Sequence, residues 1–499
     1  MKVAFIYGPF ENHGIECLSA VLKQSGHQTK LFIDNELTLP FFLNSKFLNR
    51  AISNRKRIIH DIKEGNFSLV AFSVLTNYYH PMLEFAKEIK ESCRVKICFG
   101  GIHPSSSPEE CLENDFIDYV IIGEGEFALL ELINNLEQGE KITDIQNLWL
   151  KDNGSLIKNN VRDLIQNLNA LPFPDKEIYY NELPYFSEDY VTIISRGCNY
   201  NCAFCWHSFF RKLYVNKGKY LRWRSPDNVI EELLLAKEKY NYKMVQFDDD
   251  NLLFDLKWLN DFSEKYRKHI KAPFKAFITP YIASEEMIKL LAKANCKLVE
   301  IGVQTVNEYS RKRLDIPGSL EKVKQVVDWC KEYKIKVWCD HILGLPFENN
   351  LDQDKAVLFY NELKPNYICT PYIQYYPKTR ISEEYKQAHY SFQDIQINNI
   401  TLSNNKFLSK YQLIMTTIGL LPHFLTSFLI RSKIYKILPT KFILPYMPYM
   451  LYMSRIFGST GKYQVRTKCL LKTFREIVFS GFLNIINKGN LRKNEGLGG

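Results

Sequence analysis

The stretch that decides the fold runs Ser195-Arg196-Gly197-Cys198-Asn199-Tyr200-Asn201-Cys202-Ala203-Phe204-Cys205-Trp206-His207. Its three cysteines, Cys198, Cys202 and Cys205, form a C-x3-C-x2-C triplet. A [4Fe–4S] cluster is normally held by four thiolates, so three cysteines would leave one iron open to another ligand. The alternatives are three ordinary buried thiols or a zinc site with His207 as fourth ligand, although structural zinc favours paired C-x2-C or H-x3-H arrangements.

The region around this triplet, about residues 186–390, alternates apolar strands with helical patterns in a way that predicts a partial parallel barrel of six strand–helix units. The cysteine stretch follows the first strand. Active sites of such barrels lie at the C-terminal ends of the strands, which places the triplet at the expected end. The predicted strands are Tyr190–Ser195, Met244–Phe247, Phe274–Ile278, Leu298–Val303, Lys336–His341 and Tyr367–Gln374.

The region before it, about residues 1–150, has the strand and helix alternation of a doubly wound, Rossmann-like α/β domain. Helical patterns such as Gly14–Ser25 and Pro81–Ser92 separate the strands. Ligands bind at the carboxyl ends of strands in such sheets, and three loops there combine glycines with polar groups. The predicted strands are Val3–Tyr7, Gln28–Ile33, Leu69–Ser73, Lys96–Phe99 and Tyr119–Ile122.

The cysteine triplet, with an aromatic residue just before the third cysteine, resembles the radical S-adenosylmethionine (SAM) superfamily. The resemblance implies that Cys198, Cys202 and Cys205 hold a [4Fe–4S] cluster. It also implies that the amino and carboxylate groups of SAM occupy the open iron, and that the reduced cluster cleaves SAM to a 5′-deoxyadenosyl radical. An exposed cluster of this kind is oxygen-sensitive, so we expect an anaerobic enzyme.

Motifs after the later strands resemble the SAM-binding positions of this family. They are Phe247-Asp248-Asp249-Asp250-Asn251, Glu300-Ile301-Gly302-Val303-Gln304-Thr305 and Gly344-Leu345-Pro346-Phe347-Glu348. A solvated loop or a helix N-cap is the alternative for each aspartate. Arg311, Lys312 and Arg313 could reach the SAM carboxylate, although most such charges are solvated. The residues that the resemblance assigns to SAM are Asp248, Asp249, Gln304, Gly344 and Pro346.

The N-terminal loops resemble the cobalamin-binding domain that precedes the barrel in one large class of radical SAM enzymes. The motifs are Gly100-Gly101-Ile102-His103-Pro104 and Gly123-Glu124-Gly125-Glu126. The D-x-H-x-x-G motif that supplies an axial histidine to cobalt is not present, since no aspartate stands two residues before His13. A degenerate domain without the cofactor is the alternative. The residues implied for cobalamin are Ser73, Thr76, Gly100, Gly101, His103, Gly123, Glu124, Gly125 and Glu126.

Size and cysteine content agree with this organisation. The 499 residues suffice for two or three domains, and residues 151–185, polar and broken by three prolines, are predicted to be a linker. Twelve cysteines, and a start that runs straight into a strand, predict a reducing compartment, the cytoplasm of an anaerobe. The other cysteines show no second cluster spacing, which argues against methylthiotransferases with an auxiliary [4Fe–4S] centre.

The C-terminal region, residues 391–499, is basic and aromatic. Between Asp394 and Glu476 the sequence has twelve Lys and Arg and no acidic residue, which accounts for the net charge of +10. Leu413–Ile430 is uncharged and at the lower length limit for a membrane span, and Phe442–Met453 mixes prolines with aromatics and methionines. We weigh a helical cap over the barrel mouth, a peripheral membrane surface, and a site for an anionic substrate. Nucleic acid is disfavoured because no RNA-binding module is recognisable.

We therefore expect a cobalamin-dependent radical SAM enzyme that methylates an unactivated carbon of a lipid or secondary-metabolite intermediate. A radical SAM oxidoreductase or cyclase that uses only the adenosyl radical is the alternative, and a non-catalytic corrinoid carrier would not need the cysteine triplet. The expected partners are a small-molecule or lipid-linked substrate and an electron donor such as flavodoxin or ferredoxin. The expected location is cytoplasmic or peripheral at the membrane.

Overall fold

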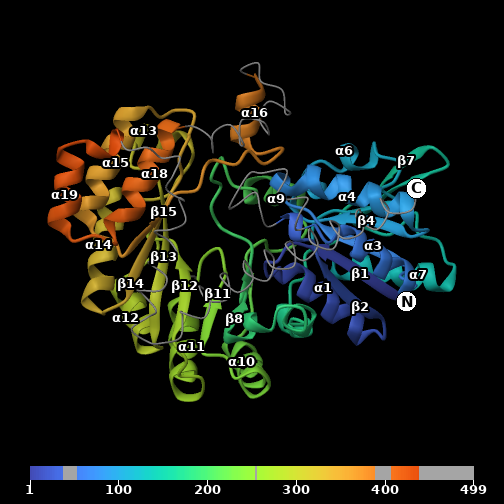
Figure 1. The fold of residues 1–499 in the computed structure, drawn as a ribbon. Coiled ribbons are helices and arrows are strands. Elements are labelled where there is room, and N and C mark those ends of the chain that lie inside the picture. The colour runs from blue at the N-terminus through green and yellow to red at the C-terminus, as the bar shows by residue number, and fades with distance from the viewer. Residues whose placement is uncertain (38–52, 253–254, 388–405, 438–499) are drawn as a thin grey trace, which may run out of the picture. The chain divides into compact units, whose positions relative to one another are not determined.

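The computed structural model describes residues 1–37, 53–252, 255–387 and 406–437. These residues form two compact units, which we describe separately (Figure 1). The first unit contains Met1–Arg162 and Pro172–Phe186, and the second contains Asp163–Leu171 and the described residues from Ser187 onward. The chain therefore leaves the first unit, returns to it, and enters the second unit again before the cysteine triplet.

The first unit is built on a seven-stranded sheet of order β2-β1-β3-β4-β5-β6-β7. The first five strands in this order are parallel, as the doubly wound pattern predicts, and the order reverses direction between β1 and β3. The strands are β1 Lys2–Tyr7, β2 Gln28–Ile33, β3 Leu69–Ser73, β4 Lys96–Gly100, β5 Tyr119–Ile121, β6 Leu148–Asp152 and β7 Ser155–Lys158.

Helices cover this sheet as the 3.6-residue patterns predict. Among them, α1 packs on α7 and α3 packs on α4. Asn12 caps α1 by accepting a hydrogen bond from the Ile15 amide at 3.0 Å. The helices are α1 His13–Gln24, α3 Arg55–Glu64, α4 Tyr79–Ser92, α5 Ile102–Ser106, α6 Pro108–Leu112, α7 Glu126–Gln138 and α8 Glu177–Tyr180, with 3₁₀ turns η1 Asn35–Leu37 and η3 Thr76–Tyr78.

The sheet continues past residue 150, into the segment predicted to be a linker. β6 pairs antiparallel with β5, and β7 pairs antiparallel with β6. Leu148 and Leu150 are buried, whereas most of β7 is exposed. Sequence patterns do not predict an edge hairpin of this kind, because its polar outer strand has the composition of a loop.

The second unit is built on a six-stranded parallel sheet of order β15-β14-β13-β12-β11-β8. Each strand pairs with its neighbour in the chain, which is the arrangement of a partial barrel, and Figure 1 shows its helices outside the strands. The strands are β8 Asp189–Thr192, β11 Met244–Phe247, β12 Phe274–Ile278, β13 Cys296–Gln304, β14 Lys336–His341 and β15 Tyr367–Cys369.

Most helices of the second unit bury apolar side chains in a core that they share with these strands. The helices are α9 His207–Leu213, α10 Pro226–Tyr240, α11 Leu256–His269, α12 Glu285–Lys293, α13 Glu308–Arg313, α14 Leu320–Glu332, α15 Asn350–Leu363, α16 Arg380–Gln387, α18 Lys406–Ile418 and α19 His423–Arg431, with 3₁₀ turns η4 Leu168–Ala170, η5 Pro184–Glu188 and η6 Ile434–Lys436.

In the second unit, two predicted strands are longer than those observed. The first ends at Thr192, and Ser195–Arg196 forms a separate strand, β9, which pairs antiparallel with β10 (Arg222–Trp223). The last ends at Cys369, and only an isolated bridge between Leu343 and Tyr372 continues it. At both ends the apolar run continues, but the chain leaves the sheet to form loops.

The uncharged run Leu413–Ile430 forms the end of α18, a turn and α19. At Gly419 an added Cβ would come within 2.0 Å of the Asn366 carbonyl oxygen, so glycine is required where the chain passes that residue. Within the described ranges no helix is long and apolar enough to cross a bilayer. The second apolar run, Phe442–Met453, lies outside the described residues.

Candidate active site

A glycine-dependent turn presents the cysteine loop. Gly197 follows β9 with φ +91°, and an added Cβ would lie 2.2 Å from the carbonyl oxygen of Tyr220. Neither the backbone angle nor the space admits a side chain there. The path of the cysteine loop as it leaves the sheet is therefore fixed by close packing against the segment that leads into β10.

The three cysteines that follow are free thiols at intermediate exposure. On α9, Arg211 donates hydrogen bonds to the carbonyl oxygens of Cys198 and, at 2.8 Å, Tyr200. Burial raises the pKa of all three thiols, to about 12 for Cys202. Without bound metal the three thiols therefore stay protonated, and iron binding must displace these protons.

The middle of the loop is fixed to the far side of the barrel. The Ala203 amide donates to the Leu314 carbonyl at 2.9 Å, and the Ala203 carbonyl accepts from the Ile381 amide at 3.1 Å. Ala203 is buried in a small apolar cluster with Leu345 and Ile373. The cysteine loop is thus held between the first strand and the segments after the fourth and sixth.

His207 does not serve as a zinc ligand here. Its Nδ1 lies 2.7 Å from the Tyr220 hydroxyl and its Nε2 lies 2.7 Å from Asp250 Oδ2, so both ring nitrogens have protein partners. The ring also stacks on Trp206 at 3.8 Å between centroids. In the part of the chain that the structure describes, no three His, Cys, Asp or Glu side chains converge on a single ion.

Asp249 clamps the strand end that precedes the cysteines. Its carboxylate accepts hydrogen bonds from the Ile194 amide at 3.0 Å, the Ser195 amide at 2.6 Å and the Ser195 hydroxyl at 2.5 Å. The side chain is buried. The carboxylate is therefore bound by protein groups, and the SAM contact expected for Asp249 stays a prediction.

The burial of Asp249 predicts a pH dependence of stability. Burial raises its pKa to about 7, and the hydrogen bonds from Ser195 and Ile194 offset part of that rise. Between the ordinary value of 3.8 and about 7, the folded protein binds more protons than the unfolded chain, so stability falls as pH rises through this window. Asp249→Asn should flatten the fall of the thermal midpoint from pH 5 to pH 7.5. An unchanged slope in the variant would contradict this assignment.

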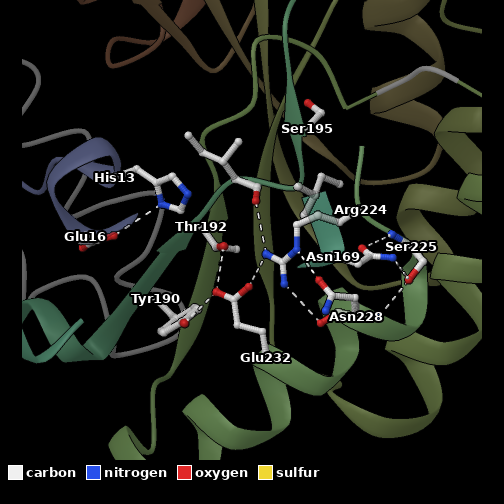
Figure 2. A network of polar contacts seen from close by, with 12 residues as sticks. His13, Glu16, Asn169, Tyr190, Thr192, Ser195, Arg224, Ser225, Asn228 and Glu232 are labelled. Carbon is white, nitrogen blue, oxygen red and sulfur yellow. Dashed lines mark hydrogen bonds and ion pairs between the residues drawn. The ribbon is translucent and has the colours of Figure 1, made fainter. Parts of the chain in front are cut away.

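A buried network anchors the same strand to α10 (Figure 2). Glu232 accepts hydrogen bonds from the Tyr190 hydroxyl at 2.7 Å and the Thr192 hydroxyl at 2.9 Å, and it pairs with Arg224. The Arg224 Nε also donates to Asn228 Oδ1 at 2.6 Å. The network thus joins the end of β8 to the first turns of α10.

The same arginine reaches the loop between β8 and β9. Its backbone amide donates to the Ile194 carbonyl at 2.8 Å, and its guanidinium donates to the Ile193 carbonyl at 3.4 Å. Beside it, Asn169 and Ser225 exchange two hydrogen bonds, at 3.0 and 3.1 Å. The returning segment, residues 163–171, therefore braces the approach to the cysteine loop.

Two of the other residues predicted to bind SAM lie at strand ends. Asp248 is exposed and its Oδ1 accepts from Gln246 at 2.5 Å. Gln304 ends β13 with φ +67° at a bulge, and an added Cβ on Gly302 would lie 2.5 Å from its side-chain nitrogen. Glycine at 302 leaves space for the Gln304 amide, which stays a predicted ribose contact.

The Gly344–Glu348 segment connects β14 to α15. Gly344 has φ +81° and Pro346 is exposed. Glu348 pairs with the Thr305 hydroxyl and accepts from the Gln353 amide at 2.8 Å, and burial raises its pKa to about 7. The predicted adenine-side segment is therefore tied to the end of β13.

Arg311 has a structural position that the sequence does not reveal. It is buried, and its guanidinium donates to the carbonyl oxygens of Val303 at 2.9 Å, Thr305 at 3.1 Å and Gly318 at 3.0 Å. The suggestion that it reaches the SAM carboxylate is not supported by this placement. Its guanidinium instead fixes the loop after β13.

Polar side chains on the inner face of the barrel were missed from the sequence. Lys275 pairs with Glu300, and Trp338 Nε1 donates to Asp340 at 2.9 Å. Their strand neighbours, such as Ile301, pack into the core under the helices, so these side chains point inward. Burial, then the neighbouring Glu300, raises the pKa of Asp340 well above its ordinary range. Charged residues within apolar strands could have signalled this interior.

In the first unit, the three predicted cofactor loops are joined to one another. The Val74 amide donates to the Gly100 carbonyl at 2.7 Å, and the His103 amide donates to the Val74 carbonyl at 3.1 Å. Ser105 Oγ donates to the Gly101 carbonyl at 2.7 Å and accepts from the Gly123 amide at 2.9 Å. The predicted gathering of these loops at one sheet edge is observed.

This edge also contains the switch point of the sheet, which is the point between β1 and β3 where the strand order reverses direction. Asn12, which follows β1, donates to Ser73 Oγ at the end of β3 at 3.1 Å. Thr76 Oγ1 is buried and has no hydrogen-bond partner among the described residues. A buried hydroxyl without a partner at this position fits a bound polar ligand.

The other predicted cofactor residues occupy different positions. His103 is fully buried and stacks on Tyr79 at 4.0 Å between centroids, and burial lowers its pKa to about 3. Its ring packs in the core beneath the loop backbone. Glu126 is buried at the start of α7, whereas Glu124 and Gly125 are half-buried. Their cofactor contacts stay predictions.

Gly101 should be the most sensitive position of these loops. Its φ is +101°, and an added Cβ would lie 3.0 Å from both Val74 backbone N and O. We expect Gly101→Ala to destabilise the first unit by about 1–3 kcal/mol and to lower corrinoid content. At Gly100 the nearest atom to an added Cβ is 3.7 Å away, so Gly100→Ala is the matched control for stability in thermal unfolding. Equal losses in both variants would contradict the argument.

A buried cation in the first unit comes from the predicted linker. Lys176 pairs with Glu11 at 2.9 Å and Glu16 at 2.6 Å, and His13 lies 3.4 Å from Glu16. Burial raises the pKa of Glu11 to about 8. No sequence pattern predicts this network, because 160 residues separate Lys176 from Glu16.

Two family models match the chain: "B12 binding domain" over residues 3–133 and "Radical SAM superfamily" over residues 192–359. The two matches fall in the first and second units respectively. The glycine loops lie within the first match and the cysteine loop within the second.

Curated relatives cover about two thirds of the chain. An uncharacterized methyltransferase of Pyrococcus horikoshii is 28% identical over 64% of this chain and 70% of its own length. The cytidylyl-2-hydroxyethylphosphonate methyltransferase of Streptomyces wedmorensis is 22% identical over 67% and 68%. The anaerobic magnesium-protoporphyrin IX monomethyl ester cyclase of Rubrivivax gelatinosus is 21% identical over 70% and 63%.

Solved structures share the fold at low identity. TsrM from Kitasatospora setae, a radical SAM methyltransferase, matches with TM-score 0.61 and 16% identity over 78% of this chain and 76% of its own. The cobalamin-dependent radical SAM enzyme OxsB matches with TM-score 0.65 and 17% identity over 96% and 81%.

Proposed function

We propose that this chain, which belongs to the radical SAM enzymes with an N-terminal B12-binding domain, methylates an unactivated carbon of a lipid or secondary-metabolite intermediate. Its cofactors are a [4Fe–4S] cluster, SAM and cobalamin. When bound, the cluster and SAM supply a radical that abstracts hydrogen, and cobalamin supplies the methyl group. An electron donor such as flavodoxin or ferredoxin would reduce the cluster.

The protein's own residues hold and orient these groups. Cys198, Cys202 and Cys205 would bind three irons, and the Asp249 clamp keeps their loop at the end of the first barrel strand. Asp248 and Gln304 would bind the amine and ribose of SAM. Each is at the carboxyl end of a barrel strand, where barrel active sites lie.

In the first unit, the joined loops would bind cobalamin. Thr76 and Ser73 offer hydroxyls at the switch point, while Gly101 and Gly123 let backbone approach the ligand closely. In the second unit, Lys275, Glu300 and Asp340 would hold a polar group of the substrate within the barrel.

One observation supports the proposal: the same chain has a cysteine loop and a set of joined glycine loops that fit the two cofactors. The cysteine loop is intact and anchored, and the first unit keeps a buried Thr76 hydroxyl without a partner among the described residues. A degenerate B12 domain would be expected to fill such a position with apolar side chains.

Anaerobic purification from cobalamin-supplied cells tests the proposal. We expect about four irons and one corrinoid per chain. Incubation with a reductant and SAM carrying a deuterated methyl group should then give 5′-deoxyadenosine, and a deuterated product from an extract of the producing cells. Iron without corrinoid would overturn the methylation proposal.

Two variants separate the cofactor sites. Thr76→Val should lower corrinoid content while leaving iron and 5′-deoxyadenosine formation unchanged. Cys198→Ala should remove iron while leaving corrinoid in place. Loss of both cofactors in both variants would mean that the two sites do not form separately.

The relative named as a cyclase favours one second candidate. The chain is 21% identical to that Rubrivivax protein over 70% of this chain. A cyclase or oxidoreductase would form 5′-deoxyadenosine and a product of altered oxidation state without a deuterated methyl group. The same labelled-SAM experiment distinguishes the two candidates.

A further inference from the structure

The helix α19 exposes apolar side chains on its outer face in addition to those that it packs inward. Ile430 is buried in the core of the second unit, and Leu429 packs against that core. Thr426 is buried and donates to Asn361 Oδ1 at 2.9 Å, and the Asn361 side chain donates to the Ser427 hydroxyl at 3.1 Å. Asn361 belongs to α15, so hydroxyl and amide groups join the apolar contact of Ile430 in docking α19 on the protein. A surface helix of a globular protein normally turns its apolar stripe inward.

The outward face of α19 is apolar. Phe424 is 71% exposed and Phe428 60% exposed, and their spacing of four residues places them on one side of the helix. Leu421 and Leu425 beside them are also exposed. Figure 1 shows α19 at the outer edge of the helices of the second unit, outside α15. Two large aromatic side chains in adjacent turns form a contiguous apolar patch, which marks an interaction surface.

The charged residues at the C-terminal end of α19 and just after it are positive. Arg431 ends α19 and is exposed, and Lys433 follows two residues later, also exposed. Lys436 pairs with Asp354, which belongs to α15. The sequence from residue 395 to residue 475 has no acidic residue at all. The patch therefore combines exposed aromatics with cations that the surrounding segment does not neutralise.

We propose that α19 lies on an anionic lipid surface, with its aromatic face among the acyl chains and Arg431 and Lys433 at the phosphates. This surface is independent of the cofactor sites and of the proposed methyl transfer. The nine residues of α19 are too few to cross a bilayer, so the helix lies in the plane of the interface.

Charge favours a lipid surface over two other occupants of the patch, which are a second copy of the chain and the C-terminal segment of the same chain. A second copy docked face to face would add the same two cations, Arg431 and Lys433, to the interface and no acidic residue of α19 to pair with them. Residues 438–475 of this chain carry only positive charges, so docking them here would also bring cations together. Anionic headgroups complement the patch, and their apolar interior accepts Phe424 and Phe428.

Flotation of the full-length holoenzyme with vesicles tests the proposal. The vesicles contain phosphatidylcholine with or without 30 mol% phosphatidylglycerol, a composition chosen to be about one third anionic. We expect binding to the anionic vesicles that weakens as salt rises, and the Phe424→Ser/Phe428→Ser variant should bind at least about tenfold more weakly.

A matched variant controls for the loss of exposed apolar surface. Leu234 and Leu235 on α10 are 44% and 52% exposed, so Leu234→Ser/Leu235→Ser removes comparable side chains elsewhere in the second unit. It should bind vesicles like the unchanged protein. Hydrogen exchange should show protection of α19 amides by anionic vesicles in the unchanged protein only, and both variants should keep the same circular dichroism spectrum.

Three results would each overturn the proposal. The unchanged protein could fail to bind anionic vesicles. The Phe424→Ser/Phe428→Ser variant could bind as well as the unchanged protein, which would place the lipid contact elsewhere. Light scattering without vesicles could show a dimer that this variant converts to a monomer, which would identify the patch as an interface between copies.

Discussion

Replacing Cys202 with alanine should abolish 5′-deoxyadenosine formation from SAM. Two thiolates cannot hold a cluster that normally takes three or four protein sulfurs, so iron content should fall with the activity. Cys202 lies in the middle of the loop, with its sulfur 3.6 Å from the Asp315 carbonyl, and neighbouring Ala203 is fixed by two backbone hydrogen bonds. The variant loop should therefore keep its path while losing one ligand. Chromatographic quantitation of 5′-deoxyadenosine after anaerobic reconstitution is the measurement.

Cys330→Ala is the matched control for removal of a thiol. Cys330 is a free, buried cysteine on α14, within the apolar core of the barrel helices. It should keep its iron and its SAM cleavage and lose only packing, at about 1–2 kcal/mol. Reductive SAM cleavage that persists in Cys202→Ala, or that disappears in Cys330→Ala, would show that the cluster is not bound by the triplet.

Replacing Glu232 with alanine should destabilise the second unit by about 3–5 kcal/mol. The change leaves the buried Arg224 guanidinium without its carboxylate, and removing one partner of a buried ion pair has an effect of this size. The hydroxyls of Tyr190 and Thr192 lose their acceptor as well. Urea unfolding of the purified enzyme under anaerobic conditions measures the loss.

The neighbouring residue gives the control for Glu232. Glu231 is on the same helix but exposed, so Glu231→Ala should change stability by no more than about 0.5 kcal/mol. We also expect iron content to fall in Glu232→Ala, because Arg224 binds the carbonyl oxygens of Ile193 and Ile194 just before the cysteine loop. A stable Glu232→Ala variant with full iron content would contradict the anchoring role.

The sequence predicted the fold because periodicity is a local signal. Five strands have the predicted bounds: Gln28–Ile33, Leu69–Ser73, Met244–Phe247, Phe274–Ile278 and Lys336–His341. Errors occur where an apolar run extends beyond the residues that pair with a neighbouring strand, as after Thr192 and Cys369. They also occur where an edge strand is polar, as at Ser155–Lys158. In these places tertiary pairing, which local sequence does not encode, decides where a strand ends.

The cysteine triplet and the glycine loops could be read from the sequence because each lies within a few consecutive residues. Their partners could not. The backbone partners of Asp249 and Arg311 were not predicted, since only the folded chain brings these groups near. His103 likewise stacks in the core, although its motif suggested a ligand contact.

By itself, the sequence determined the fold class, the order of the two domains and the cofactor chemistry, because short motifs and hydrophobic periodicity carry that information. Only the tertiary structure decided which polar groups are occupied and which face solvent. Glu232 meets Arg224, Lys176 meets Glu16, and α19 turns Phe424 outward through contacts between distant segments. Burial and pairing depend on the whole folded chain, so no local pattern could have fixed them.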